Sequence, residues 1–311
     1  MFSYRHAFHA GNHADVLKHM VLLQLLEYLN QKDTPYMVID THAGAGMYLL
    51  DSEYAMRSGE AESGIAMLWD KKDLPAPLAQ YVGMVKAMNP SGKMRFYPGS
   101  PFCAEKIMRE EDRLRLFEMH STEILVLDEN IRKLQAHQAA QGQRPARGKR
   151  ILIQRADGFA GLKALLPPPS RRGLILIDPS YEDKDDYRKV KVAIEDAMQR
   201  FATGTYAIWY PVLGRLDSQQ LPERLKRVSN GNWLNVTLTV GSPTEEGMGL
   251  RSSGMLIINP PWTLQATLKD TMPYLVDALG VDDAATFSIQ VSGAETAKPI
   301  KERTRKSAHD E

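Results

Sequence analysis

The sequence predicts an α/β fold built on a doubly wound, mostly parallel sheet. Short apolar runs typical of strands alternate along the chain with longer segments of helical periodicity. The run Leu-Ile-Leu-Ile at 174–177 has no polar alternation, as expected of a strand buried on both faces of a parallel sheet. The composition, 43% hydrophobic and 25% charged, is ordinary for a globular protein, and 311 residues allow one large α/β domain or two small ones.

The expected elements follow one another in a regular order. The first is an amphipathic helix from about residue 13 to 30, with Asn12 as its N-cap, and a strand in 36–46 then enters a glycine-bearing turn. Later strands are expected at 114–120, 150–159, 174–177, 205–212, 233–240 and 254–262, and helices at 101–110, 121–139, 158–166 and 185–201. Because no long helix separates the last two strands, we expect an antiparallel hairpin at one edge of the sheet.

One gap between these elements is too long for a simple βαβ unit. The acidic residue that holds a ribose normally follows the glycine turn by about 20 residues, but far more separate Gly46 from Glu118. The segment 48–97 has a helical pattern interrupted by prolines, which predicts a small helical subdomain inserted into a sheet domain of residues 1–47 and 98–290. The segment 136–150 and the tail 291–311 have little to bury, so we expect disorder there.

Charge and cysteine content limit the class of protein. The formal net charge is +1, so the protein as a whole has no basic field that would indicate a nucleic-acid partner. Basic residues do cluster locally, at Arg171–Arg172, 144–150 and 298–306, where they are either solvated surface or phosphate contacts. The single cysteine, Cys103, excludes an internal disulfide and a thiolate metal cluster, and one cysteine is typical of a protein of the reducing cytosol. We expect Cys103 to be a small buried hydrophobic residue. The N-terminus is too polar for a signal peptide and no apolar run approaches a membrane span, so we expect a soluble, cytoplasmic protein with no membrane partner.

Acidic residues follow several of the predicted strands, where ligands of open α/β sheets bind. Glu118 is suited to pairing with two ribose hydroxyls, and Asp157-Gly158 to accepting from an adenine amino group. The turn 43–46 lets the backbone approach a ligand, although a plain tight turn is the alternative. It lacks the third glycine and basic partner of a pyrophosphate site. The pattern therefore predicts a pocket for an adenosine with a cationic, non-phosphate group, and S-adenosylmethionine is such a ligand.

The residues Asp178-Pro179-Ser180-Tyr181 follow the buried run 174–177. Asp178 could simply cap a turn while Pro179 ends the strand. The functional interpretation starts from the exocyclic amine of a base, which is a poor nucleophile because its lone pair is delocalised into the ring. A carboxylate, Asp178, and the carbonyl of Pro179 would accept hydrogen bonds from that amine and orient it, while the ring of Tyr181 would stack on a flipped base.

These four residues resemble the Asp/Asn-Pro-Pro-Tyr/Phe signature of amino-methyltransferases that act on adenine or cytosine. The segments SYRHAFHAGNHADVLKH, DTHAGAG, YPGSP, ADGF, SRRGLILIDP, YAIWYP and INPPW are similar to the RlmJ family of 23S ribosomal RNA adenine-N6 methyltransferases, from residue 1 to about 290. The resemblance implies a Rossmann-like class I S-adenosylmethionine-dependent methyltransferase fold with a small inserted helical subdomain. It also implies N6-methylation of one adenine of 23S ribosomal RNA (adenine 2030). We further expect the RNA to be naked or partly assembled and the protein to act as a monomer.

The resemblance further implies roles for individual residues. Asp178 would be the catalytic proton acceptor, assisted by Pro179 and Tyr181, while Tyr4, His6 and Lys18 match an N-terminal motif near the mouth of the site and would bind substrate. The implied cofactor contacts are His19, His42, Ser100, Glu118, Asp157, Gly158 and Asp178. The chain departs from the family pattern in Ser180, which replaces a proline, in a longer and more basic loop at 136–150, and in the extra tail.

Other interpretations remain open at this point. His9 and His13 are spaced like zinc ligands on a helix, but Ala10 stands where a metalloprotease has glutamate, so no metal is predicted. A DNA amino-methyltransferase would use the same chemistry, although the chain has no obvious room for a large sequence-reading domain. A non-catalytic nucleic-acid-binding protein would require a decayed site, against which the intact Asp178 and Tyr181 argue. The aromatic residues Trp209, Tyr210 and Trp262 could belong to the core or to a pocket rim.

Overall fold

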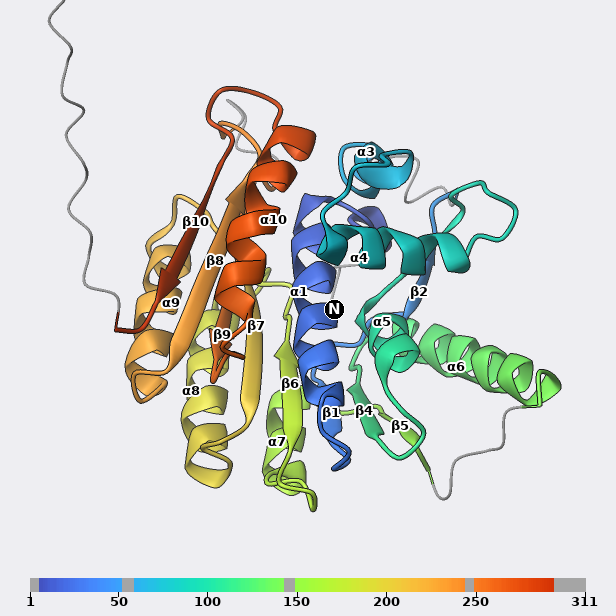
Figure 1. Ribbon diagram of the computed structural model, residues 1–311. Helices are drawn as coiled ribbons and strands as arrows, with labels where there is room; N and C mark the ends of the chain where they lie inside the picture. Colours follow the sequence, from blue (N-terminus) through green and yellow to red (C-terminus); the bar gives the residue numbers. More distant parts are fainter. Residues whose placement is uncertain (1–5, 52–58, 143–148, 244–248, 294–311) are drawn as a thin grey trace, which may run out of the picture.

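The computed structural model describes residues 6–51, 59–142, 149–243 and 249–293, and it is organised around an eight-stranded sheet (Figure 1). The strand order is β10-β8-β9-β7-β6-β1-β4-β5. Five neighbouring strands are parallel: β5 (Ile151–Gln154), β4 (Arg113–Phe117), β1 (Met37–Asp40), β6 (Gly173–Ile177) and β7 (Thr205–Pro211). The predicted α/β class with a mostly parallel sheet is therefore confirmed.

The other end of the sheet is antiparallel. The predicted hairpin forms from β8 (Trp233–Thr239) and β9 (Ser252–Ile258), and β9 also pairs with β7. Its expected place at the edge was wrong, because an unexpected strand, β10 (Thr286–Val291), pairs antiparallel with the outer side of β8. This strand supplies hydrogen-bond partners to backbone groups of β8 that would otherwise form an open edge.

Helices cover both faces of the sheet. One face carries α1 (His13–Asn30), α5 (Ser100–Ile107) and α10 (Leu264–Leu279), and the other carries α7 (Gly158–Leu165), α8 (Asp185–Arg200) and α9 (Leu216–Val228). Strand β6 shows why its run has no polar alternation. Leu174 and Leu176 join the core cluster under α1, whereas Ile175 and Ile177 join the cluster under α8. Both faces of this strand are buried, as predicted.

Helix α1 begins as expected but is not amphipathic. The side chain of Asn12 accepts a hydrogen bond from the backbone N–H of Asp15 at 2.9 Å, which confirms the predicted N-cap. Most of the helix is buried, including polar His13, Asp15, Lys18 and His19, because the helix is packed between the sheet and α4. The helical periodicity thus predicted the helix correctly but not its exposure.

Between β1 and α5, the described residues form two helices and a small second sheet. Helices α3 (Ile65–Trp69) and α4 (Ala76–Ala87) lie between β2 (Met47–Leu49) and β3 (Phe96–Pro98), which pair antiparallel. Buried side chains of α4 belong to the same core cluster as α1. The division of the chain into a sheet domain and a helical subdomain therefore stays a prediction.

The expected disorder is only partly open to comparison. Helix α6 (Glu123–Ala140) continues into the polar segment 136–150, so the expectation of disorder was wrong for residues 136–140. Residues 143–148 and 294–311 lie outside the described part of the chain. Cys103 is fully buried in α5, as predicted.

Candidate functional site

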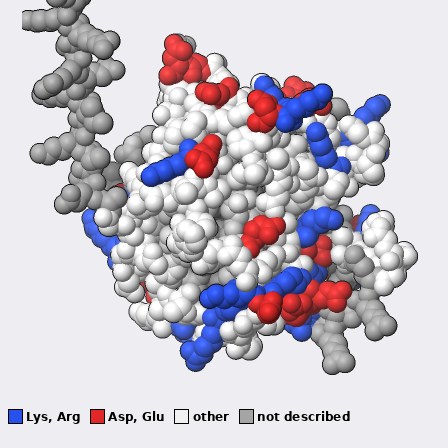
Figure 2. All heavy atoms as spheres, in the orientation of Figure 1, with Lys and Arg blue, Asp and Glu red and all other residues white. Residues whose placement is uncertain are grey.

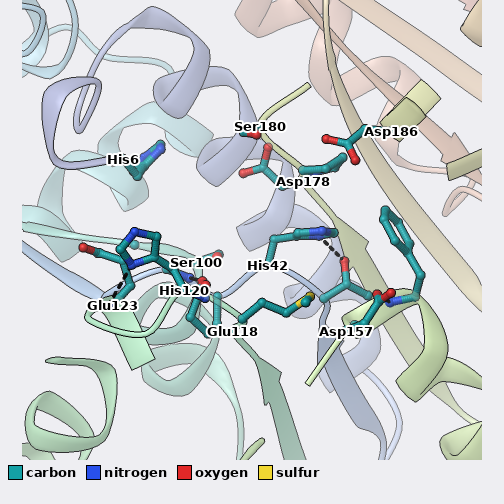
Figure 3. A pocket seen from close by; sticks show the side chains of 18 of the residues that line it. His6, His42, Ser100, Glu118, His120, Glu123, Asp157, Asp178, Ser180 and Asp186 are labelled. Atoms are coloured by element: carbon teal, nitrogen blue, oxygen red, sulfur yellow. Dashed lines mark hydrogen bonds between the residues drawn. The ribbon is translucent and has the colours of Figure 1, made fainter. Parts of the chain in front are cut away.

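A pocket lies at the carboxyl ends of the parallel strands, the place expected for a ligand of this fold (Figure 3). Its empty volume of about 1100 Å³, part of it open to solvent, is large enough for an adenosine-sized ligand. Of the residues predicted for the site, those that line the pocket are His6, Lys18, His19, His42, Ser100, Glu118, Asp157, Gly158, Asp178 and Pro179. Tyr4 lies outside the described residues.

The glycine turn and Glu118 form one wall. The Glu118 carboxylate accepts hydrogen bonds from the backbone N–H of Gly44 at 2.8 Å and of His120 at 2.6 Å, which ties the turn after β1 to the end of β4. Burial raises the pKa of Glu118. Gly44 has a φ of 58°, and a Cβ there would lie 2.3 Å from the Tyr48 hydroxyl, so the turn requires glycine.

Asp157 and Gly158 form a second wall at the start of α7. The Asp157 side chain accepts from the backbone N–H of Phe159 at 2.8 Å, so this acid is the N-cap of the helix as well as a pocket residue. A Cβ on Gly158 would lie 2.2 Å from the carbonyl oxygen of Thr41, so only glycine allows the two loops to approach this closely.

His19 presents an unpartnered nitrogen at the pocket. The residue is fully buried, and its Nδ1 is 2.8 Å from the Tyr97 hydroxyl, which in turn is 2.8 Å from the hydroxyl of Tyr81 in α4. Its Nε2 is buried without a hydrogen-bond partner. Burial lowers the pKa of His19 to about 3, so the ring is neutral at physiological pH. Because buried polar atoms are normally paired, the free Nε2 is a position for a polar ligand atom.

Ser100 and His42 are held by a buried acid that the sequence analysis missed. Asp40 ends β1, and its carboxylate accepts from the Ser100 hydroxyl at 2.6 Å and from the backbone N–H of His42 at 3.2 Å. Burial raises the pKa of Asp40 to about 6 and lowers the pKa of His42 to about 4. The His42 ring also meets Phe159 edge-on at 4.9 Å between ring centroids. An acid ending a buried strand was the signal available in the sequence.

Asp178 belongs to a chain of buried charges. Its carboxylate oxygen is 2.6 Å from the Lys18 ammonium, which lies 2.8 Å from Asp15, and Asp15 accepts from His6 at 2.9 Å. The nearby carboxylates raise the pKa of Lys18 well above its usual value despite the opposing effect of burial. Lys18 and His6 were predicted at the mouth of the site, but Asp15, which holds both, was not predicted. Figure 3 shows Asp178 across the pocket from Glu118.

Tyr181 is not part of the pocket wall, contrary to the prediction that its ring stacks on a base. The ring is 1% exposed, because it packs 4.7 Å from the ring of Tyr187 in α8 and its hydroxyl donates to the carbonyl of Trp209 at 2.8 Å. Tyr181 has a φ of 54°, which turns the side chain into the core under α8. Pro179 and Ser180 of the same turn do line the pocket.

Several remaining candidates have structural roles. His9 pairs with Glu60 and His13 with the carbonyl of Leu250, so the two helix-spaced histidines face different partners. Within the described ranges, no cluster of three or more His, Cys, Asp or Glu side chains is placed to hold a metal ion.

The aromatic candidates differ in exposure. Tyr210 is buried, whereas Trp262 is 80% exposed and follows the end of β9. Because β9 runs antiparallel to β7, it ends at the opposite edge of the sheet from the pocket.

Two arginines of the basic clusters are anchored to backbone groups. Arg172 donates to the carbonyls of Leu29 and Lys32 at the end of α1, where cations are favoured. Arg150 pairs with Glu105 at 2.8 Å and donates to the carbonyl of Met108. These contacts give both guanidinium groups a structural role. In the residues that the structure covers, no helix is sufficiently long and apolar to span a membrane.

Known proteins share this architecture and sequence. Residues 33–290 match the family model described as ribosomal RNA large subunit methyltransferase D, RlmJ. The chain is 46% identical over 275 residues to ribosomal RNA large subunit methyltransferase J of Escherichia coli, covering 88% of this chain and 93% of that one. It is 42% identical over 291 residues to the Haemophilus influenzae protein of the same name, covering 93% and 98%.

A solved structure agrees with this relationship. The crystal structure of protein LPL1258 from Legionella pneumophila superposes with a TM-score of 0.80 at 34% identity, covering 92% of this chain and 99% of that one. The match includes the Rossmann-like sheet, and the family model spans the pocket residues from His42 to Asp178. The chain therefore belongs to the RlmJ family of ribosomal RNA methyltransferases, with a Rossmann-like class I methyltransferase fold.

Proposed function

We propose that the protein methylates the N6 amine of one specific adenine in 23S ribosomal RNA, with S-adenosylmethionine as methyl donor. The observation that carries this proposal is Asp178, a carboxylate at the end of β6 that lines the same pocket as the glycine turn and Glu118. Family membership supports the reaction class, because the curated relatives are named as methyltransferases of large-subunit ribosomal RNA.

The residues of the pocket fit S-adenosylmethionine. The buried Nε2 of His19 has no protein partner and can bond a polar atom of the ligand. Glu118 uses each carboxylate oxygen for one backbone N–H and retains lone pairs for ribose hydroxyls, beside Ser100 and Asp157. When bound, this cofactor supplies an electrophilic methyl group on a positively charged sulfur.

Asp178 would orient the amine of the target adenine and take up its proton. As the amine nitrogen bonds to the methyl carbon, the carbon–sulfur bond breaks and the sulfur leaves neutral. The nitrogen then carries an extra proton, which passes to the Asp178 carboxylate. The carbonyl of Pro179 would accept the second N–H of the amine. Lys18 keeps a positive charge 2.6 Å from Asp178, which steadies the carboxylate before substrate arrives.

The partner would be 23S ribosomal RNA that is free or only partly covered by ribosomal proteins, and the protein would act as a monomer. A flipped adenine has to enter the pocket, which requires an accessible RNA strand. Lysines and arginines on the face seen in Figure 2 alternate with aspartates and glutamates, so binding would rely on local contacts.

The test is a methylation assay with three nucleic acids. Protein and methyl-labelled S-adenosylmethionine are mixed with unmethylated 23S ribosomal RNA, with assembled large subunits or with duplex DNA. The products are digested and mapped by mass spectrometry. We expect N6-methyladenosine at one position of naked RNA and none with Asp178→Ala. Labelled DNA with unlabelled RNA would instead favour the DNA amino-methyltransferase alternative, and no transfer to any of the three would contradict catalysis.

A further inference from the structure

The turn that follows Asp178 adopts a conformation that its own sequence does not favour. Tyr181 has a φ of 54°, in the left-handed region, which is uncommon for a bulky side chain. Residues in such conformations persist when surrounding contacts fix them, and they cluster at functional sites. Ser180, which stands where the family pattern has proline, does not add the ring constraint of proline to this turn. Contacts from outside the turn must therefore hold it.

Contacts with β7 and α8 fix the side chain of Tyr181. They do not involve its backbone carbonyl, which needs a partner of its own. The hydroxyl donates to the carbonyl of Trp209 in β7 at 2.8 Å, and the ring packs on Tyr187. These contacts anchor the far end of the residue. The peptide group at its near end connects directly to Ser180 and Pro179, whose atoms line the pocket.

Arg215 holds that carbonyl. Its Nη2 donates to the Tyr181 carbonyl oxygen at 2.9 Å and to the Tyr187 hydroxyl at 3.1 Å, and its guanidinium lies 5.2 Å from the centroid of the Tyr187 ring. Arg215 stands at the N-cap position of α9, just after β7, which is the parallel neighbour of β6. The side chain thus ties the loop after β7 to the catalytic loop after β6.

The partners of Arg215 are neutral. Within the described ranges, no carboxylate oxygen lies within 4.0 Å of its guanidinium nitrogens, and its buried Nε has no hydrogen-bond partner. A partly buried guanidinium without an acidic partner is costly to desolvate, so an ion pair does not account for its place. Both hydrogen bonds come from one nitrogen, Nη2, whose two N–H groups are fixed in the guanidinium plane, whereas a lysine ammonium on a flexible stem holds such a pair of acceptors less well.

We propose that Arg215 is a positioning residue for methyl transfer. By holding the Tyr181 carbonyl, it fixes the turn so that the Asp178 carboxylate and the Pro179 carbonyl both face the amine of the target base. This inference rests on the proposed function. It assigns to Arg215 no contact with the cofactor, since Arg215 does not line the pocket.

The experiment compares Arg215→Met, Arg215→Lys and the matched control Arg227→Met, which changes an exposed arginine of the same helix. Single-turnover methylation of 23S ribosomal RNA is measured together with calorimetric cofactor affinity and thermal unfolding. We expect Arg215→Met to lower the single-turnover rate on the order of 10²-fold, the cost of a misplacement of about 1 Å, with cofactor affinity unchanged. Arg215→Lys retains one donor nitrogen, without the rigid guanidinium plane, and should be intermediate, and the control should match the wild type.

The outcomes separate this inference from the proposed function. An inactive wild type would reject the proposed function itself. An active wild type with an equally active Arg215→Met would reject only the positioning role. A lysine variant as slow as the methionine variant would also overturn it, because the carbonyl hydrogen bond would then not be the determining contact. If Arg215→Met does not fold, the comparison of Arg215→Lys with the control still decides the question.

Discussion

The ammonium of Lys18 in α1 and the carboxylate of Asp178 after β6 are 2.6 Å apart, and both side chains are largely buried. The first helix of the chain therefore contributes a charge to the catalytic end of the sheet, across a separation of 160 residues. Asp15 takes the other side of the ammonium, so one lysine compensates two acids. In this arrangement, the pocket cannot be built without the N-terminal helix.

We predict that Lys18→Met lowers the free energy of unfolding by about 3 to 5 kcal/mol, the range for removing one partner of a buried ion pair. The reason is that Asp15 remains buried with its charge less well compensated. Urea denaturation measures the change. Lys191→Met is the control, because its pair with Glu195 is partly exposed and should contribute about 0 to 1 kcal/mol. Equal losses in the two variants would show that burial does not matter at Lys18.

Glu118→Ala should weaken binding of S-adenosylmethionine by about 1.5 to 3 kcal/mol, the range for hydrogen bonds to a charged group. The change also removes the acceptor for the backbone N–H of Gly44, so the glycine turn loses a support. Isothermal calorimetry gives the affinity. Glu129→Ala, at an exposed position of α6, serves as control. Unchanged affinity in a folded Glu118→Ala protein would exclude Glu118 from the cofactor site.

The pH dependence of stability should change with Asp40→Asn. The folded pKa of Asp40 is raised from 3.8 to about 6, so the folded state holds this proton more tightly than the unfolded state. Protonated Asp40 therefore adds about 3 kcal/mol to the free energy of unfolding below pH 3.8. This stabilisation is lost as the pH rises through 6. The lowered pKa of His42, about 4, acts in the opposite direction, because protonation of the unfolded state below pH 6.5 removes stability.

Asp40→Asn removes the first effect and keeps the second. Relative to the wild type, the variant should therefore gain free energy of unfolding as the pH rises from about 4 to 6. Denaturant titrations at several pH values across this window provide the measurement. Parallel pH profiles for the two proteins would mean that Asp40 titrates normally in the folded state.

Ser180→Ala should keep most methyltransferase activity, and Ser180→Pro should keep or modestly raise it. Among the described residues, the Ser180 hydroxyl makes one long contact, 3.5 Å from the backbone nitrogen of Glu182, and methyl transfer to an amine needs no covalent enzyme intermediate. Asp178→Ala should lose nearly all turnover while circular dichroism stays native. Single-turnover assays compare the three variants. A Ser180→Ala protein as inactive as Asp178→Ala would assign the hydroxyl a chemical role.

The sequence predicted the parts of the site that local chemistry determines. Glu118, Asp157 and Asp178 each follow a strand, and parallel strands bring their carboxyl ends to one edge, so these acids had to meet near the pocket. Gly44 followed from the turn after the first strand, whose left-handed φ of 58° favours glycine, whereas the close approach of Gly158 to the Thr41 carbonyl is a tertiary contact. The apolar run at 174–177 indicated burial on both faces because no polar residue interrupts it.

What the sequence could not predict depends on tertiary contacts. The direction of the Tyr181 ring is set by a left-handed backbone angle that Arg215, Trp209 and Tyr187 stabilise, and no neighbouring residue indicates that angle. The sequence left Arg172 open between solvated surface and phosphate contact, and neither interpretation included the carbonyls at the end of α1 to which it donates. Strand β10 was missed because its stability comes from the free edge of β8 rather than from its own partly exposed sequence.

The pairing of β2 with β3 has a consequence for how this protein can change in length. Residues 47–49 and 96–98 are neighbours in space, so the chain leaves the sheet and returns at nearly the same point. Insertions or deletions between them would leave the ends of the excursion in place, and the entropy of closing a loop rises only slowly with its length. The helices of the excursion are the exception, because α3 and α4 contribute buried side chains to the core around α1, and the Tyr81 hydroxyl reaches Tyr97 and through it His19. The excursion can therefore drift in length during evolution in its exposed connections, such as 70–73 and 90–93, provided that these two helices stay packed.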